Sequence, residues 1–374
     1  MELTKGKEIL GLPSNFKFGI EIEADNVQTK GEGGLYTGES ARLIESRNWH
    51  MATAMEESLV KHGGAELVSP VLTDNEADWT SIAEMCEHIK GFPGKKGETV
   101  VANEECGLHI HFDSECLTSN PEIYRNFLRI YAESEELLYK MCNDINDPIR
   151  RNAIYKNFHG LQIISSIWRN GMASPLGKKI LKQIENGTLK VSHKKFGKLR
   201  MILGKYKLDE RRYHGLNLTN IGNEKKNTIE FRMSNGTLDP EVIKQNVFLY
   251  SSLINAAIQS TLNPQQYEEK LQRFYDTDVT EREKVENFLN LIMDNPEDRQ
   301  IYMARWESVK DAPVFKDNAK KGFAQNRFKR EQFETIAQRT SPYKIKDAYE
   351  YIKSIYTRTV TKPKDKGDME HDDR

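Results

Sequence analysis

The sequence lacks the features that mark membrane, secreted and nucleic-acid-binding proteins. No apolar run approaches the roughly 20 residues that cross a bilayer, and residues 1–15 lack the apolar core of a signal peptide. Neither sign of charge dominates, because 55 Lys and Arg face 56 Asp and Glu, a formal net charge of -1. No global field therefore favours nucleic acid. We expect a cytoplasmic protein without membrane or nucleic-acid partners.

Several catalytic signatures are also missing. The sequence contains no GxxxxGK[ST] phosphate loop and no Ser-His or Cys-His pattern typical of nucleophilic catalysis. Only four cysteines occur, none in CxxC spacing, which favours reduced thiols over a disulfide framework. Chemistry must therefore be sought among carboxylates, histidines and arginines.

Two segments alternate with a period of two, as strands do. In the first, NFKFGIEIEA, the pattern predicts Glu21 and Glu23 on one face, opposite Phe18, Ile20 and Ile22. Neighbouring like charges repel, so a cation is the usual reason for such a pair, and oxygen ligands suit Mg²⁺ or Mn²⁺. An isolated ExE is more often only a solvent-facing strand.

The second alternating segment is CGLHIHFD, residues 106–113. It predicts His109 and His111 on one strand face and apolar residues on the other. Such a pair can hold a metal or a phosphate, although single strand histidines are common. A third acidic candidate, Glu66, lies in the small, apolar AELVSP strand, where an unpaired carboxylate would be costly to bury.

A further polar face is predicted between residues 211 and 240. Residues 216–219 form one strand, and residues 228–233 form another, with Glu230 and Arg232 opposite Ile229, Phe231 and Met233. An adjacent Glu and Arg can be no more than an ion pair. Helices are predicted after a cap at Asp74 or Asn75, from Pro121 to about Cys142, from Glu241 to Thr261, and repeatedly after Pro264.

The order of these segments resembles the amidoligase family, carboxylate–amine ligases related to glutamine synthetase and glutamate–cysteine ligase. The resemblance covers roughly residues 16–250, through ExE, ELVSP, CGLHIHF, RRYHGLN and TIEFRMSNGTLD. It implies an α+β fold with a curved, mostly antiparallel sheet of the glutamine-synthetase catalytic type, backed by helices. ATP and Mg²⁺ (or Mn²⁺) are the implied cofactors. The implied substrates are a carboxylate and an amine on amino acids, peptides or proteins.

Position by position, the resemblance assigns each candidate a role. The implied metal ligands are Glu21, Glu23, Glu57 (or Glu56), Glu66, His109 and Glu230. Nucleotide-binding roles go to His111, Arg232 and Asn217, and catalytic roles to Arg232, Arg212 and Arg211. One departure is that related sequences carry Asp-Gly-Ser-Leu where this chain has Glu56-Glu57-Ser58-Leu59, which leaves the ligand among the two glutamates open.

We predict a catalytic domain over residues 1–262 with a basic helical insertion at about 148–205. A helical extension at 263–358 would pack on it, and residues 359–374 would be disordered. The predicted activity is ATP-dependent amide formation through an acyl phosphate. Two alternatives remain: a metal-dependent amidohydrolase, whose barrel also opens with a His-x-His strand, and a non-catalytic binding protein of the same fold.

Overall fold

The computed structural model describes residues 10–12, 16–29, 34–51, 64–94, 98–102, 104, 106–118, 121–149, 215–217, 220, 226–312 and 314. All belong to a unit that combines Met1–Gly160 with Asp209–Arg327. The second unit, Leu161–Leu208 with Phe328–Arg374, lies outside the described residues, as do most of the predicted basic insertion and all of the predicted tail.

Within the described residues, six strands form a single sheet in the order β2-β3-β1-β4-β6-β5, and every pairing between them is antiparallel. The strands are β1 (Phe18–Ala24), β2 (His50–Met51), β3 (Ala65–Val68), β4 (Gly107–Asp113), β5 (Leu216–Asn217) and β6 (Thr228–Asn235). The two alternating segments of the sequence are therefore adjacent central strands. The predicted α+β class and antiparallel sheet are confirmed.

The helices of the described residues are α1 (Gly38–Ser46), α3 (Glu76–Lys90), α4 (Glu115–Thr118), α5 (Pro121–Met141), α9 (Pro240–Leu262), α10 (Pro264–Tyr275), α11 (Glu281–Ile292) and α12 (Pro296–Val309). The helices predicted before residue 91, from Pro121, from Glu241 and after Pro264 are present, whereas α1 and α4 were not predicted. Asn75 and Asp239 cap α3 and α9 through their side chains, which satisfies amide groups that a helix start leaves unpaired. Among the described residues, no helix combines the length and apolar character needed to cross a membrane.

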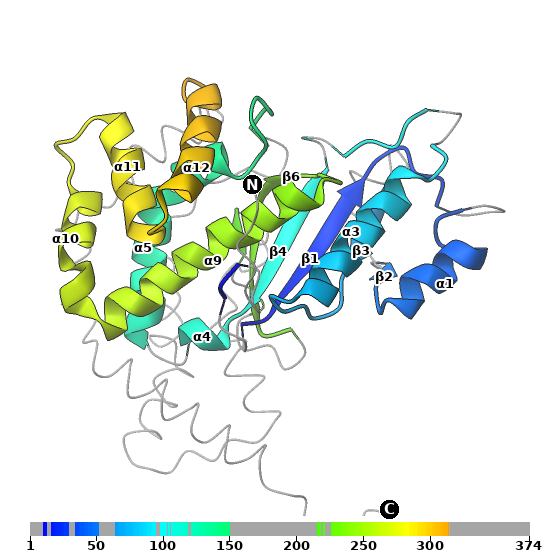
Figure 1. Ribbon diagram of the computed structural model, residues 1–374, viewed down its shortest axis with the longest axis horizontal. Coiled ribbons are helices and arrows are strands. Elements are labelled where there is room, and N and C mark those ends of the chain that lie inside the picture. The colour runs from blue at the N-terminus through cyan, green and yellow to red at the C-terminus, as the bar shows by residue number, and fades with distance from the viewer. Residues whose placement is uncertain are drawn as a thin grey trace, which may run out of the picture. The chain divides into compact units, whose positions relative to one another are not determined.

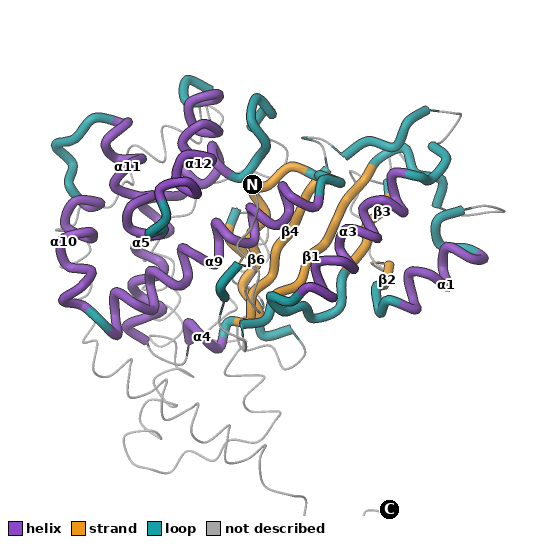
Figure 2. The backbone as a smooth tube through the Cα atoms, in the orientation of Figure 1, coloured by secondary structure: helices purple, strands orange, loops and turns teal. Residues whose placement is uncertain are grey.

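Helices cover one face of the sheet and so define its other face as the polar one. Figure 1 shows α3 and α9 lying across the strands, and Figure 2 shows the strands as one layer behind them. Phe231 of β6 stacks on Tyr250 of α9 with ring centroids 4.2 Å apart, and Phe18 of β1 stacks on Trp79 of α3 at 5.3 Å. This packing commits the apolar face of each strand to the core, and alternation then directs the intervening side chains to the opposite face.

A register shift changes the pattern in β6. Leu108 pairs with Ser234 and Ile110 pairs with Phe231, so His109 alone faces two residues, Arg232 and Met233. This bulge inserts one residue into the alternation. Met233, predicted on the apolar face, is fully buried. Ser234 also lies against α9, with its hydroxyl 2.7 Å from that of Tyr250.

A buried aspartate ties the N-terminal segment to α3. Asp74 accepts hydrogen bonds from the backbone amides of Leu10 and Leu12, at 2.7 and 3.2 Å, and from the Trp79 indole at 2.9 Å. We expect Asp74→Ala to lower the free energy of unfolding by about 3 kcal/mol, because buried donors would lose a charged acceptor. Urea unfolding measures this. Glu87→Ala, in an exposed pair with Lys90, serves as control, and an Asp74→Ala midpoint equal to the control's would contradict the assignment.

Candidate metal and nucleotide site

The site is assembled by the register of five neighbouring strands, β3, β1, β4, β6 and β5. Across the sheet, Glu23 pairs with Glu66 and Glu21 pairs with His109. Further along, Glu230 lies between His111 and Asn217. Side chains of directly paired residues share a face, so these positions form one continuous polar band. The band joins segments that are separated by up to about 200 residues in the chain.

Glu21 lies at the centre of this band. Its Oε2 is 3.1 Å from His109 Nδ1, and its Oε1 is 3.1 Å from His111 Nε2. One carboxylate therefore contacts both histidines of the HIH strand. Burial by itself would raise the pKa of Glu21, but hydrogen bonds and charge from the two imidazoles outweigh it and hold the pKa well below its ordinary value.

Two groups of three side chains have the spacing of a metal site. Glu21, Glu66 and His109 place ligand atoms within 4.8 Å of one another, and so do Glu21, His111 and Glu230. We call these the first and second carboxylate–imidazole groups. Glu21 is common to both. Oxygen and imidazole donors of this kind suit Mg²⁺ and, with nitrogen ligands, Mn²⁺.

Glu23 occupies a different position from the other predicted ligands. Its Oε1 is 3.8 Å from His109 Nε2, while its Oε2 accepts a short hydrogen bond from the Gly107 amide. Among the described residues, neither three-residue group includes it. Glu23 therefore borders the first group, and one of its oxygens is already committed to the backbone of β4.

Glu230 is held by two partners at the other end of the band. Arg232 forms a short ion pair with Oε1, and Asn217 Nδ2 donates to Oε2 at 2.6 Å. Burial favours the neutral acid, but Arg232 and the histidines lower the pKa of Glu230, which keeps the carboxylate ionised. The predicted candidates Arg232 and Asn217 thus both lie against a predicted metal ligand.

The two histidines differ in accessibility. His109 is 1% exposed, whereas the side chain of His111 retains 13% and that of Glu21 retains 14%. Burial lowers the pKa of His111, but its hydrogen bond to Glu21 and the charges of Glu230 and Glu21 raise it overall. The resemblance assigns His111 to the phosphates, and the geometry in addition gives it a place in the second carboxylate–imidazole group.

The remaining predicted site residues cannot be placed. Glu56, Glu57, Arg211 and Arg212 lie outside the described residues. Their assigned roles stay predictions. The structure brings together Glu21, Glu23, Glu66, His109, His111, Asn217, Glu230 and Arg232.

The family comparison covers the strands that carry this band. A family model described as "Putative amidoligase enzyme" matches residues 16–254, which include β1 through most of α9. The chain belongs to the amidoligase family. Membership of this family supports, in general terms, an enzyme of the ligase type. No curated protein and no solved structure matches the chain.

Two contacts near this amidoligase sheet were not predicted from sequence. The hydroxyl of Tyr36 lies 3.1 Å from both the amide nitrogen and the carbonyl oxygen of Glu66. Ser40 Oγ lies 2.7 Å from His88 Nε2, joining α1 to α3. Ser40 is only 9% exposed, so this pair is a structural link and not a reachable nucleophile. No sequence pattern signals either contact, because each joins positions at least 30 residues apart.

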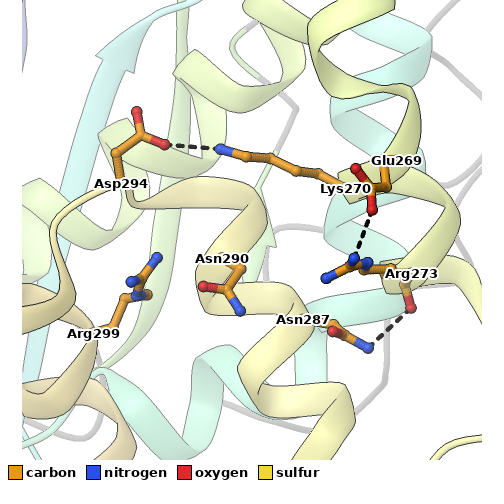
Figure 3. A pocket seen from close by; sticks show the side chains of 7 residues that line it. All are labelled: Glu269, Lys270, Arg273, Asn287, Asn290, Asp294 and Arg299. Carbon is orange, nitrogen blue, oxygen red and sulfur yellow. Dashed lines mark hydrogen bonds and ion pairs between the residues drawn. The ribbon is translucent and has the colours of Figure 1, made fainter.

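A polar cavity in the helical layer is separate from the amidoligase site. It measures about 360 Å³ and is lined by Glu269, Lys270, Arg273, Asn287, Asn290, Asp294 and Arg299. Figure 3 shows that Lys270 reaches Asp294 and that Arg273 reaches Glu269, so its charges largely pair with each other. No residue of the sheet lines it, and it offers no carboxylate–imidazole group.

Proposed function

We propose that the protein is an ATP-dependent carboxylate–amine ligase that activates its carboxylate substrate as an acyl phosphate. The observation that carries this proposal is the pair of carboxylate–imidazole groups joined through Glu21, with Arg232 beside them. Amide formation in water is uphill, so the carboxylate must first be activated. Phosphoryl transfer needs in-line positioning and positive charge around the phosphate oxygens.

The donor set fits divalent cations. Glu21, Glu66 and His109 would hold one cation, and Glu21, His111 and Glu230 a second. Bound there, Mg²⁺ or Mn²⁺ would supply positive charge to the phosphate oxygens of ATP. Such a use also explains why the carboxylates of Glu21 in β1 and Glu66 in β3 lie close together, an arrangement that is unfavourable without a cation.

The chemistry proceeds in two balanced steps. A carboxylate oxygen of the substrate attacks the γ-phosphorus and ADP leaves, giving the acyl phosphate. The amine nitrogen then attacks the acyl carbon, inorganic phosphate leaves, and the nitrogen loses a proton. Arg232 contributes a permanent charge and holds Glu230 ionised within the second group.

The sheet itself weighs against the amidohydrolase alternative. Amidohydrolase barrels are built from parallel strands with catalytic residues at their carboxyl ends. Here the His-x-His strand pairs antiparallel with both neighbours, and its ligand partners come from the middle of those strands. We therefore also propose that the sheet is of the glutamine-synthetase catalytic type.

The decisive experiment combines purified protein, ATP and Mg²⁺ with a matrix of carboxylic acids and amines. We expect ADP release only when an acid and an amine are both present. With isotopically labelled carboxylate oxygens, one labelled oxygen should appear in the released phosphate, because the carboxylate oxygen becomes the bridge to phosphorus. ADP release that ignores both substrates, or phosphate without the label, would contradict the ligase. Persistent absence of turnover with intact nucleotide binding would instead favour the binding-protein alternative.

A further inference from the structure

The hydroxyl of Tyr36 contacts the backbone of the predicted ligand Glu66 in an unusual way. The Glu66 amide donates to this hydroxyl, and the hydroxyl donates to the Glu66 carbonyl, both at 3.1 Å. One side-chain oxygen thus satisfies both backbone groups of the residue, as a neighbouring strand normally does. In the described residues, the pairing of β3 with β2 runs from His50–Val68 to Met51–Leu67. At the next position of β3, Glu66, the Tyr36 hydroxyl bonds to the backbone.

The direction of this contact shows how Glu66 faces β1. In an antiparallel pair, the N–H and C=O of one residue point to the same side. Those of Glu66 point to Tyr36, so its pairing with Glu23 is of the type without hydrogen bonds, in which side chains lie closest. The backbone of Glu66 at this point is held by Tyr36 rather than by β1.

The backbone of Tyr36 is itself held in place by hydrogen bonds and by a buried neighbour. The Leu35 amide donates to the Gln28 carbonyl at 2.8 Å, and the Tyr36 amide donates to Thr29 at 3.2 Å. Leu35 is fully buried, and α1 starts two residues later.

We propose that Tyr36 is a positioning residue that sets the Glu66 carboxylate relative to Glu21 and His109. It would thereby set the affinity of the first carboxylate–imidazole group for a divalent cation. The inference rests on the proposed function, since it takes that group to be a cation site. Glu66 belongs to the first group alone, because the second consists of Glu21, His111 and Glu230.

The test measures how Mn²⁺ binds to the full-length protein without ATP or substrates. Calorimetry gives the affinity and the number of sites, and the spin-resonance signal of free Mn²⁺ gives an independent measure of the bound fraction. Tyr36→Phe removes only the hydroxyl. We expect it to lower the Mn²⁺ affinity of one of two sites by about 10-fold. This is the lower end of the loss of affinity that is typical when a residue that orients a metal ligand is replaced. The other site should keep its wild-type affinity. Glu66→Gln should weaken the same site more strongly.

The matched control is Tyr302→Phe. The Tyr302 hydroxyl also donates to a backbone carbonyl, that of Gln245, at 2.7 Å, but it lies between α12 and α9. We expect this variant to lose stability without any change in Mn²⁺ affinity. A second readout is the rise in unfolding midpoint that Mn²⁺ produces, which should shrink for Tyr36→Phe and stay unchanged for Tyr302→Phe.

The outcomes separate the two proposals. If Tyr36→Phe binds both Mn²⁺ ions like the wild type while Glu66→Gln does not, Tyr36 has no positioning role and the ligase proposal stands. If Glu21→Gln and Glu66→Gln also bind Mn²⁺ like the wild type, the cation site is wrong, and both proposals fall together.

Discussion

Glu21→Gln is expected to abolish measurable Mn²⁺ binding and to lower ligase turnover by more than about 100-fold, beyond the range typical of residues that only orient ligands. The reason is its central place: Glu21 is the only side chain shared by the two carboxylate–imidazole groups in the described part of the chain. An amide at this position keeps the size of the side chain but removes its negative charge. Both cation sites should therefore weaken together, unlike the single site expected for Tyr36→Phe.

The control for this substitution is Glu87→Gln, on the exposed surface of α3. It should leave Mn²⁺ binding, turnover and stability unchanged. Circular dichroism and thermal unfolding check that Glu21→Gln remains folded. A folded Glu21→Gln that still binds two Mn²⁺ ions would contradict the geometry on which the proposed function depends.

Arg232→Met is expected to destabilise the protein by about 3–5 kcal/mol, the range for breaking a buried ion pair. Arg232 and Glu230 are 4% and 3% exposed, so removing the guanidinium leaves the Glu230 carboxylate buried without its main countercharge. Urea unfolding measures the loss, and turnover should fall as well. Mn²⁺ should restore part of the stability, because a cation at the second group would supply positive charge to Glu230.

Two further variants define the cause of this loss. Arg232→Met combined with Glu230→Gln should recover much of the stability, since no charge then remains unpaired. Arg273→Met breaks the exposed pair with Glu269, where both side chains are more than half exposed, and should change stability by less than about 1 kcal/mol. Equal losses of stability for Arg232→Met and Arg273→Met would show that the buried Glu230 carboxylate does not need the charge of Arg232.

The polar face of each strand was predictable because strand alternation is local. Glu21 and Glu23 share a face, and so do His109 and His111, whatever the rest of the chain does. Helix starts were also local: the sequence allows Asp74 or Asn75 to cap α3, and Asn75 does so, while Asp239 with Pro240 begins α9 as predicted. The bulge in β6 was not predictable, because no residue type at Arg232 and Met233 marks the inserted position.

The sequence alone therefore determines, through strand alternation, which side chains lie on the polar face of each strand. The chemistry of these side chains already favours binding of a cation and a phosphate. Only the tertiary structure decides which of them meet. Pairing Glu21 with His109 and Glu230 with His111 depends on a register between strands that lie far apart in the chain, and a shift of one residue would turn the whole set to the other face. The shared position of Glu21 and the hold of Tyr36 on Glu66 arise from that register and from the packing around β3.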